Sequence, residues 1–454
     1  MKHGLVALLT ILTVAITAFS TANKEYEVFV QSGVFVQDPD KQFLGEFKNS
    51  KSLVIDHVSS KGYELYGPTG FEKMLDAKKI SYKRLEIPMD PLDPMADYPT
   101  YAQITKGLQD LQAKYPSIMT LTSLGKSHRG RDLWMVKISD NVQSDEIEPE
   151  VKFVSSMHGD EITGRELMMR LIDDLGKGYG VNQEITTLIN NTEVYIMPSM
   201  NPDGSEARTR YNGRGLDLNR NFPDFSVLSN TNIAEGREPE TQAMMKFEVA
   251  HHFSMSANFH TGAEVVNYVW DTAHVRHPQD SLARKISLDY ASRVPYMANS
   301  TEFQNGITNG YDWYEVNGGM QDYTTYWYND LHFTVELSGE KWPQYSTIDG
   351  YYRDNKVALL AFLQTVHQGA GFKINEANQV GLVEVIHLKA QPISLGKFPF
   401  WNSEFFKVLE PGKYRFVVKA VSGRSAEFET TVGLLQAIPN NGNYMNISLG
   451  NIVP

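Results

Sequence analysis

A long alternation of two kinds of apolar pattern limits most strongly how this chain can fold. Over residues 98–368, segments with helical periodicity, such as 165–175, alternate with short apolar runs typical of buried strands. Such runs occupy residues 151–154, 194–197 and 333–337. Strands that are apolar throughout are buried on both faces, and the intervening helices cover those faces. The alternation therefore predicts an α/β domain built on a largely buried mixed sheet.

The charge balance and the lack of cysteine exclude several classes of function. Acidic residues number 54 and basic residues 42, which gives a formal net charge of −12 across 454 residues. No run of Lys or Arg supplies the basic stripe that a phosphate backbone requires, so we expect no nucleic-acid partner. The absence of cysteine excludes disulfides, thiolate metal sites and cysteine nucleophiles.

The first 22 residues have the layout of a secretory signal peptide. Lys2 precedes an apolar run over residues 5–19, and small residues follow at 20–22. The run is shorter than the span of about 20 apolar residues that a membrane anchor needs, and Asn23, Lys24 and Glu25 close it. We therefore predict a secreted or periplasmic protein without stable membrane insertion after the signal is removed. An uncleaved anchor is the alternative.

Composition divides the rest of the chain into three parts. Residues 24–95 read as a small α+β unit that ends in a proline cluster at positions 88, 91, 94 and 99, and this cluster suits an extended linker. Residues 96–369 hold the α/β pattern. Residues 370–454 offer short β runs separated by turns at 411–412 and 422–423, which predicts a small β-sandwich.

The segment His158-Gly159-Asp160-Glu161 predicts half of a metal site. It follows the apolar run 151–154 and precedes a helix that begins near Thr163, which is where open α/β sheets place their chemistry. On the first helical turn, His158 and Glu161 would point the same way and supply a nitrogen and a carboxylate to zinc. Alone, the pair is weak evidence, and a helix cap or a salt bridge is then the favoured interpretation.

The third ligand has to come from elsewhere, because the chain contains no H-E-x-x-H or H-x-x-E-H pattern. His260, at the end of an apolar strand-like run, is the best candidate. Two histidines and one carboxylate leave zinc a position for water, which the cation acidifies toward neutral pKa. We therefore expect one Zn²⁺ per chain and a hydrolytic reaction.

Several charged groups outside the metal site could contact a substrate. Residues 201–224 are dense in Asn, Arg and Gly, and an Arg fork grips a carboxylate bidentately, although a solvated loop held by surface salt bridges is the plainer interpretation. A glycine-hinged loop over 317–323 carries Tyr323. Glu336 interrupts an apolar strand, so it either faces a cleft or pairs with a core arginine.

Taken in order, these motifs resemble the zinc carboxypeptidases of the M14 type. The motifs are HGDE at 158–161, NPDG at 201–204, DLNRNFPD at 217–224, GGMQDY at 318–323 and FTVELS at 333–338. Within that group the chain most resembles the regulatory branch, which removes basic C-terminal residues. The resemblance implies the mixed-sheet carboxypeptidase fold for residues 96–369. For residues 370–454 it implies a transthyretin-like β-sandwich, on the turn at 409–414.

The resemblance also implies a role for each residue that matches a family motif. The zinc ligands would be His158, Glu161 and His260, and Glu336 would be the general base. The residues that contact the peptide backbone would be Arg210 at the scissile carbonyl, Asn219 and Arg220 at the terminal carboxylate, and Tyr323 as the mobile tyrosine that closes over it. Asp271, with Gln321 as a helper, would recognise a C-terminal Lys or Arg. An Arg fork that needs a terminal carboxylate implies an exopeptidase acting on the C-termini of peptides or proteins.

Two other functions remain open. A zinc carboxypeptidase acting on bacterial cell-wall peptides would use the same groups. A non-catalytic protein that binds peptide ends would be expected to lose a ligand or the base, whereas all four residues are present. Residues 24–95 have no ready counterpart in the regulatory branch and would be an activation peptide, a chaperone-like unit or a permanent accessory domain. The sequence makes no prediction of oligomeric state.

Overall fold

The computed structural model describes residues 32–48, 50, 52–85, 98–227, 231–433 and 444–450. The contacts within the chain define two compact units, residues 1–86 and 87–454. The predicted signal peptide, residues 1–22, lies outside the described residues. Among the residues described, no helix is both long enough and apolar enough to cross a membrane.

The first unit has the α+β arrangement predicted for it. Its four strands pair antiparallel in the order β2-β3-β1-β4. The strands are β1 (Ser32–Val36), β2 (Val54–Ser59), β3 (Gly62–Gly67) and β4 (Tyr82–Arg84), and two short helices, α2 (Leu44–Lys48) and α3 (Glu72–Ala77), accompany them. Val34, Val36, Tyr63, Leu65 and Leu75 are fully buried and form the core of this unit.

The second unit is built on an eight-stranded mixed sheet, as the alternating pattern predicts. Its strand order is β11-β10-β12-β9-β7-β8-β6-β5. The strands are β5 (Met119–Lys126), β6 (Asp132–Ile138), β7 (Glu150–Ser155), β8 (Glu193–Met197), β9 (Phe253–His260), β10 (Ala263–Tyr268), β11 (Ile307–Asn309) and β12 (Leu331–Ser338). The four central strands, β12, β9, β7 and β8, run parallel and are buried along their whole length.

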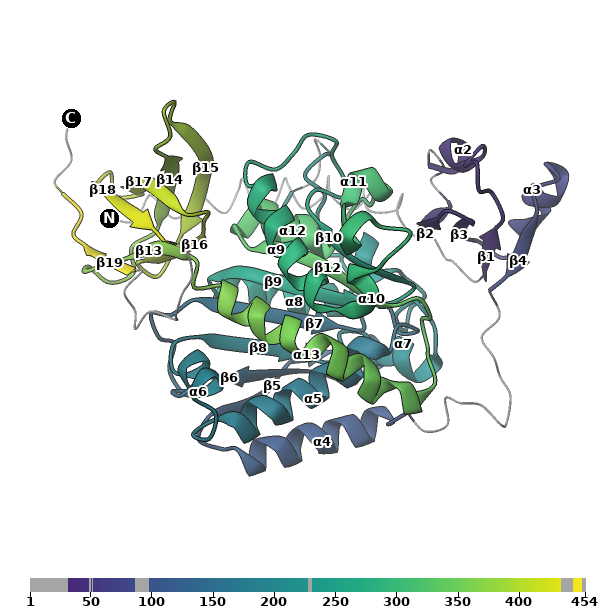
Figure 1. The fold of residues 1–454 in the computed structure, drawn as a ribbon, viewed down its shortest axis with the longest axis horizontal. Helices are drawn as coiled ribbons and strands as arrows, with labels where there is room; N and C mark the ends of the chain where they lie inside the picture. Colours follow the sequence, from purple (N-terminus) through teal and green to yellow (C-terminus); the bar gives the residue numbers. More distant parts are fainter. Residues whose placement is uncertain are drawn as a thin grey trace, which may run out of the picture. The chain divides into compact units, whose positions relative to one another are not determined.

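Helices cover both faces of this sheet (Figure 1). One face packs against α4 (Tyr101–Lys114), α5 (Thr163–Gly178), α9 (Asp280–Arg293) and α13 (Ile348–Thr365). The other face packs against α8 (Pro239–Ala250) and α12 (Met320–Tyr328). Short helices in the connections are α6 (Gln183–Ile189), α7 (Pro202–Ala207), α10 (Pro295–Ala298) and α11 (Gly310–Trp313), with 3₁₀ turns η2 (Leu218–Arg220), η3 (Gln304–Gly306) and η4 (Tyr345–Thr347).

The last part of the chain forms two small sheets that share one apolar core. The first has the order β16-β13-β19 and the second β15-β14-β17-β18. The strands are β13 (Gly369–Ile374), β14 (Gly381–His387), β15 (Ile393–Phe400), β16 (Glu404–Val408), β17 (Gly412–Ala420), β18 (Ser425–Val432) and β19 (Tyr444–Ile447). Phe372 and Phe416 are fully buried between the sheets. This arrangement is consistent with the predicted β-sandwich.

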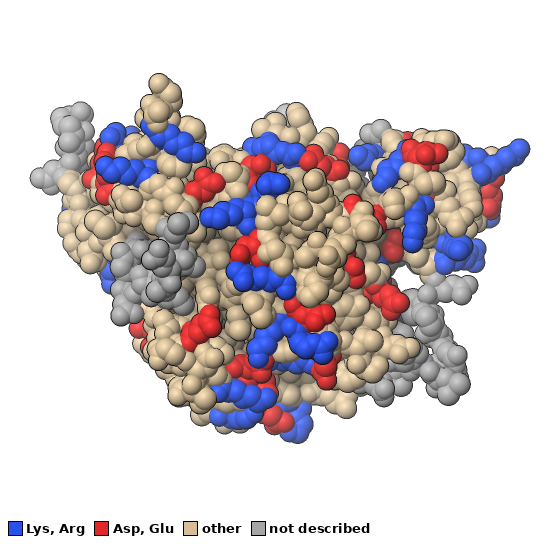
Figure 2. All heavy atoms as spheres, viewed as in Figure 1, with Lys and Arg blue, Asp and Glu red and all other residues tan. Residues whose placement is uncertain are grey.

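The direction of the central strands positions the candidate site. Because β7, β9 and β12 are parallel, their carboxyl ends meet at one edge of the sheet. The metal-ligand segment follows β7, His260 ends β9, and Glu336 lies near the end of β12. Acidic and basic side chains are interspersed on the face of the molecule shown in Figure 2.

Candidate active site

Three predicted ligands converge on one point. The His158 Nδ1 atom lies 2.9 Å from Glu161 Oε1, and the His260 Nδ1 atom lies 2.8 Å from Glu161 Oε2. The two Nδ1 atoms are 3.1 Å apart. All three residues are buried. His158 and His260, which are 102 positions apart in the sequence, therefore present their nitrogens to the same small space as the Glu161 carboxylate.

The prediction that His158 and Glu161 lie on the first helical turn is wrong. Helix α5 begins at Thr163, so both ligands lie in the loop before it. Ser156 in this loop has a left-handed backbone conformation (φ 49°), and its hydroxyl donates to the Glu161 carbonyl at 3.0 Å. The loop thus reaches the ligand geometry through side-chain bonding and not through helical periodicity.

Close packing against the NPDG segment shapes the same loop. A Cβ atom on Gly159 would lie 2.0 Å from the carbonyl carbon of Gly204, so only glycine fits. Asn201 donates from Nδ2 to the Met157 carbonyl at 3.1 Å, and its Oδ1 accepts from the Gly204 amide at 2.9 Å. Asn201 therefore joins the ligand loop to the start of α7.

The cluster suits a zinc ion. Two imidazole nitrogens and a carboxylate are the donor set of catalytic zinc sites, and a cation lets all three act as lone-pair donors although they lie so close together. Burial alone would raise the pKa of Glu161, but the facing imidazoles of His158 and His260 hold it well below its usual range. Glu161 is therefore ionised, as a ligand must be.

Asp217 completes the environment of His158, and the sequence analysis did not single it out. Its Oδ1 lies 3.1 Å from His158 Nε2 and accepts from the Asn219 amide at 2.9 Å. Burial would raise the pKa of Asp217, but the charges of Arg210 and His158 hold it well below its usual range. A carboxylate on the second ring nitrogen orients a metal-ligating histidine. That general requirement is the signal that His158 has a carboxylate partner, and the fold identifies the partner as Asp217.

Arg210 lies beside the ligand cluster. Its Nε donates to Asp217 Oδ2 at 2.9 Å, and its Nη1 lies 3.4 Å from Glu161 Oε1. The Arg210 carbonyl also accepts from the Gly159 amide at 3.3 Å. The guanidinium is buried and fixed next to the metal ligands.

Glu336 lies on the strand next to His260. The two residues are register partners on the parallel strands β12 and β9, so their side chains project from the same face of the sheet. Glu336 is buried and does not belong to the ligand cluster itself. This placement puts a further carboxylate alongside the metal ligands.

Two predicted pocket residues also meet. Gln321 donates from Nε2 to Asp271 Oδ1 at 2.9 Å, and Asn267 donates from Nδ2 to the same oxygen at 2.9 Å. Burial raises the pKa of Asp271 to about 6, although Asn267 and Arg220 oppose this. The backbone amides of Asp271 and Thr272 donate to Asp322, which fixes the start of this loop.

Asn219 and Arg220 lie next to this acidic group. Both belong to η2, where Arg220 donates from Nη1 to the Asn219 carbonyl at 3.0 Å. A Cβ atom on Gly319 would lie 3.3 Å from Asn219 Oδ1 and 3.8 Å from Asp271 Oδ2. The groups predicted for the terminal carboxylate and for the side chain therefore both lie close to Gly319.

Comparison with known proteins identifies the family. A sequence model of the zinc carboxypeptidases matches residues 104–358. The chain belongs to the zinc carboxypeptidase family. Carboxypeptidase M of Mus musculus is 37% identical over 338 residues, covering 68% of this chain and 74% of that protein. The carboxypeptidase N catalytic chain of Homo sapiens is 32% identical over 378 residues, covering 73% of this chain and 82% of that protein.

These relatives confirm the resemblance to the regulatory branch. Carboxypeptidase D of Mus musculus is 36% identical over 333 residues, which cover 68% of this chain, and the match spans about a quarter of that protein's length. Among solved structures, carboxypeptidase A from Helicoverpa armigera has a TM-score of 0.58 at 19% identity, covering 73% of this chain and 97% of that one. Thrombin-activatable fibrinolysis inhibitor has a TM-score of 0.55 at 18% identity, covering 74% of this chain and 98% of that one. The structures show the shared carboxypeptidase fold.

Within this carboxypeptidase fold, Tyr323 does not lie where the motif predicts. It is 1% exposed in α12, its ring centroid lies 5.3 Å from that of Phe222, and its hydroxyl donates to Asn232 Oδ1 at 3.0 Å. The packing of α12 against α8 holds this ring in the apolar core, so its assignment as a mobile closing tyrosine is wrong.

Another tyrosine lies on the loop that wraps Asp271. Tyr314 follows α11, in a segment whose Tyr311 amide donates to the Trp270 carbonyl at 2.8 Å and whose Val316 amide donates to the Asp271 carbonyl at 3.2 Å. Gly310 and Gly318 flank this segment in the sequence. Tyr311 and Tyr314 thus share the pattern of an aromatic hydroxyl between two glycines, which Tyr323, following Gly318 and Gly319, lacks.

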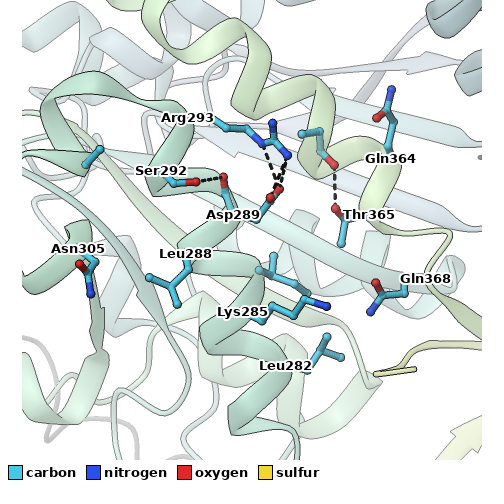
Figure 3. Close-up of a pocket in the computed structure, with 13 residues that line it drawn as sticks. Leu282, Lys285, Leu288, Asp289, Ser292, Arg293, Asn305, Gln364, Thr365 and Gln368 are labelled. Atoms are coloured by element: carbon cyan, nitrogen blue, oxygen red, sulfur yellow. Dashed lines mark hydrogen bonds and ion pairs between the residues drawn. The ribbon is translucent and has the colours of Figure 1, made fainter. Parts of the chain in front are cut away.

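A separate surface groove of about 670 Å³ lies between α9 and α13 (Figure 3). None of the predicted site residues lines it. Arg293 and Asp289 on its rim pair with each other within α9 at 2.9 Å. The groove is therefore distinct from the metal cluster.

Proposed function

We propose that the protein is a zinc-dependent carboxypeptidase that removes the C-terminal residue of peptides or proteins. The observation that carries this proposal is the convergence of His158, Glu161 and His260 beside Arg210 and Glu336. When bound, zinc would polarise water and the scissile carbonyl. Family membership supports the metal and the reaction class.

Glu336 would act as the general base. Its carboxylate is a register neighbour of a metal ligand, so it can accept the proton of the attacking water and deliver it to the departing amine nitrogen. Arg210 would stabilise the negative charge that develops on the carbonyl oxygen. Asp217 and Glu161 hold its guanidinium in place before substrate arrives, which is the preorganisation that such stabilisation needs.

Asn219 and Arg220 would bind the free terminal carboxylate. An internal peptide bond offers no such carboxylate, so a longer chain in this position would leave the guanidinium without its partner. Tyr314, on the loop around Asp271, would close over the bound residue. This replaces the assignment to Tyr323.

Asp271 and Gln321 would select a C-terminal Lys or Arg. The carboxylate of Asp271 is buried, and both it and Asn219 lie within 4 Å of the position that a Cβ atom on Gly319 would take, so the proposed side-chain and carboxylate groups are neighbours. A buried carboxylate favours a cationic side chain that can pair with it. Hydrolysis of blocked dipeptides ending in Arg, Lys, Phe or Leu tests this, and a strong preference for Phe would overturn it.

The organisation of the chain supports a secreted enzyme of several parts. The apolar segment 5–19 would direct export, residues 96–369 would form the catalytic domain and residues 370–454 the β-sandwich. The first unit, within residues 24–95, would be a pro-segment or an accessory domain. Trimming the purified protein near the proline cluster tests inhibition, because unchanged activity after cleavage would exclude it.

The experiment that tests the function combines metal analysis with the peptide panel. Wild type should bind one zinc per chain and release single C-terminal residues. Glu336→Gln should retain zinc and lose turnover. Turnover without zinc, or cleavage at internal bonds, would contradict the proposal.

A further inference from the structure

The loop that joins β6 to β7 carries a second group of potential metal ligands. Asp140, Glu146 and Glu148 each offer a carboxylate oxygen, and these oxygens all lie within 4.8 Å of one another. The three residues fall within residues 139–149, ahead of the first residue of β7. Two of the three proposed zinc ligands, His158 and Glu161, follow the other end of the same strand. A strand of six residues spans about 20 Å, so the two groups are well separated.

Glu148 has a buried carboxylate oxygen that lacks a hydrogen-bond partner among the residues described. Its side chain is 7% exposed, and its Oε2 atom is buried with no hydrogen-bond donor in the described part of the chain. Burial, together with the charges of Asp140, Glu146 and Glu193, raises the pKa of Glu148 to about 8. A buried carboxylate without compensation is costly, so either a proton or a cation has to balance it.

Lys137, the cation whose charge acts on Glu148, is already engaged. Lys137 donates from Nζ to Glu193 Oε1 at 2.6 Å and to the Ser144 carbonyl at 2.7 Å. Tyr195 donates to the second oxygen of Glu193 at 2.7 Å. Both oxygens of Glu193 thus accept hydrogen bonds from protein donors, whereas Glu148 Oε2 accepts none in the described part of the chain.

We propose that Asp140, Glu146 and Glu148 bind a calcium ion. All three donors are carboxylate oxygens, which suit a hard cation and not zinc. Ca²⁺ takes six to eight oxygens in flexible geometry, so water and loop carbonyls can complete its shell. Mg²⁺ demands near-ideal octahedral geometry. Asp140 is exposed, which gives the ion a route into the site. We expect a dissociation constant of about 10⁻⁴ to 10⁻³ M, the range of extracellular calcium modules.

The consequence would be structural. An ion bound here would fix the β6–β7 connection at the edge of the sheet opposite the zinc ligands. It would therefore raise the unfolding temperature of the protein without touching the residues proposed for catalysis.

Calcium titration of the zinc-saturated full chain tests this proposal. Calorimetry should show one calcium site with an affinity in the expected range, and about 10 mM Ca²⁺ should raise the unfolding temperature by several degrees. Glu148→Gln should abolish both effects. The matched control, Glu235→Gln, removes an exposed acid elsewhere and should leave both unchanged.

Asp140→Asn provides a second variant at an exposed position in case Glu148→Gln does not fold, and it should weaken calcium binding at least tenfold. The proposal is overturned if wild type binds no calcium, or if both loop variants bind it as wild type does. Mg²⁺ binding as tight as Ca²⁺ binding would overturn the assignment to calcium.

Discussion

The Asp217 carboxylate lies 3.1 Å from His158 Nε2, while the opposite ring nitrogen of His158 faces Glu161 at 2.9 Å. One imidazole is therefore held between a proposed metal ligand and a carboxylate that also binds Arg210. This relationship couples the metal ligands to the residue proposed to stabilise the oxyanion. It gives Asp217 a positioning role.

Substitution of Asp217 should loosen the metal site. Asp217→Asn removes the charge that orients His158, so we expect zinc affinity to fall by about 10- to 100-fold. Competition with a chelator measures this. Asp224→Asn is the matched control, because Asp224 lies in the same motif but caps the amide of Ser226. Equal zinc affinity in the Asp217 variant and wild type would refute the role.

Separate substitution of Tyr314 and Tyr323 by phenylalanine should distinguish their roles. Tyr314→Phe should lower kcat/KM, since the hydroxyl proposed to close over the substrate is lost. Tyr323→Phe should leave kinetics unchanged and cost about 1 kcal/mol of stability, because its hydroxyl bonds Asn232. Peptide hydrolysis and thermal unfolding of both variants provide the measurements. A kinetic defect confined to Tyr323→Phe would restore the original assignment.

The preference for basic residues should depend on pH. Burial raises the pKa of Asp271 to about 6, so this carboxylate is charged above that pH and becomes neutral as the pH falls through it. The ratio of kcat/KM for C-terminal Arg to that for Leu should therefore fall on acidification. Asp271→Asn should give a low ratio at every pH. A constant ratio in wild type would argue against Asp271 as the selecting group.

Gly159 should tolerate no side chain. A Cβ atom there would overlap the Gly204 backbone, which cannot move aside as a flexible side chain can. We expect Gly159→Ala to lose about 1–3 kcal/mol of stability and much of its zinc affinity. Denaturant unfolding with and without zinc tests this. Gly433→Ala, at a glycine with open space around it and no positive φ, is a control for alanine itself.

The sequence identifies features that depend on local pattern and on motif. The buried strands are apolar throughout, so the mixed sheet could be predicted, and the structure brings His158, Glu161 and His260 together as expected. Features that depend on packing could not be predicted. Nothing local to Tyr323 shows that α12 turns its ring toward Phe222.

The conformation of the loop that carries His158 and Glu161 could not be predicted from the sequence either. The helix begins at Thr163, as predicted, but the spacing of His158 and Glu161 does not reflect a helical turn, because both lie in the loop that follows the left-handed Ser156. Asp217 acts only through contact with His158, which is 59 positions away in the sequence. Such a partner becomes evident once the chain is folded.

Anomalous scattering from crystals of the purified protein at the zinc absorption edge tests the central claim most directly. The account predicts one strong peak about 2.0–2.2 Å from His158 Nδ1, Glu161 and His260 Nδ1. A zinc peak held by other residues, or zinc-loaded protein with these three side chains apart, would contradict it.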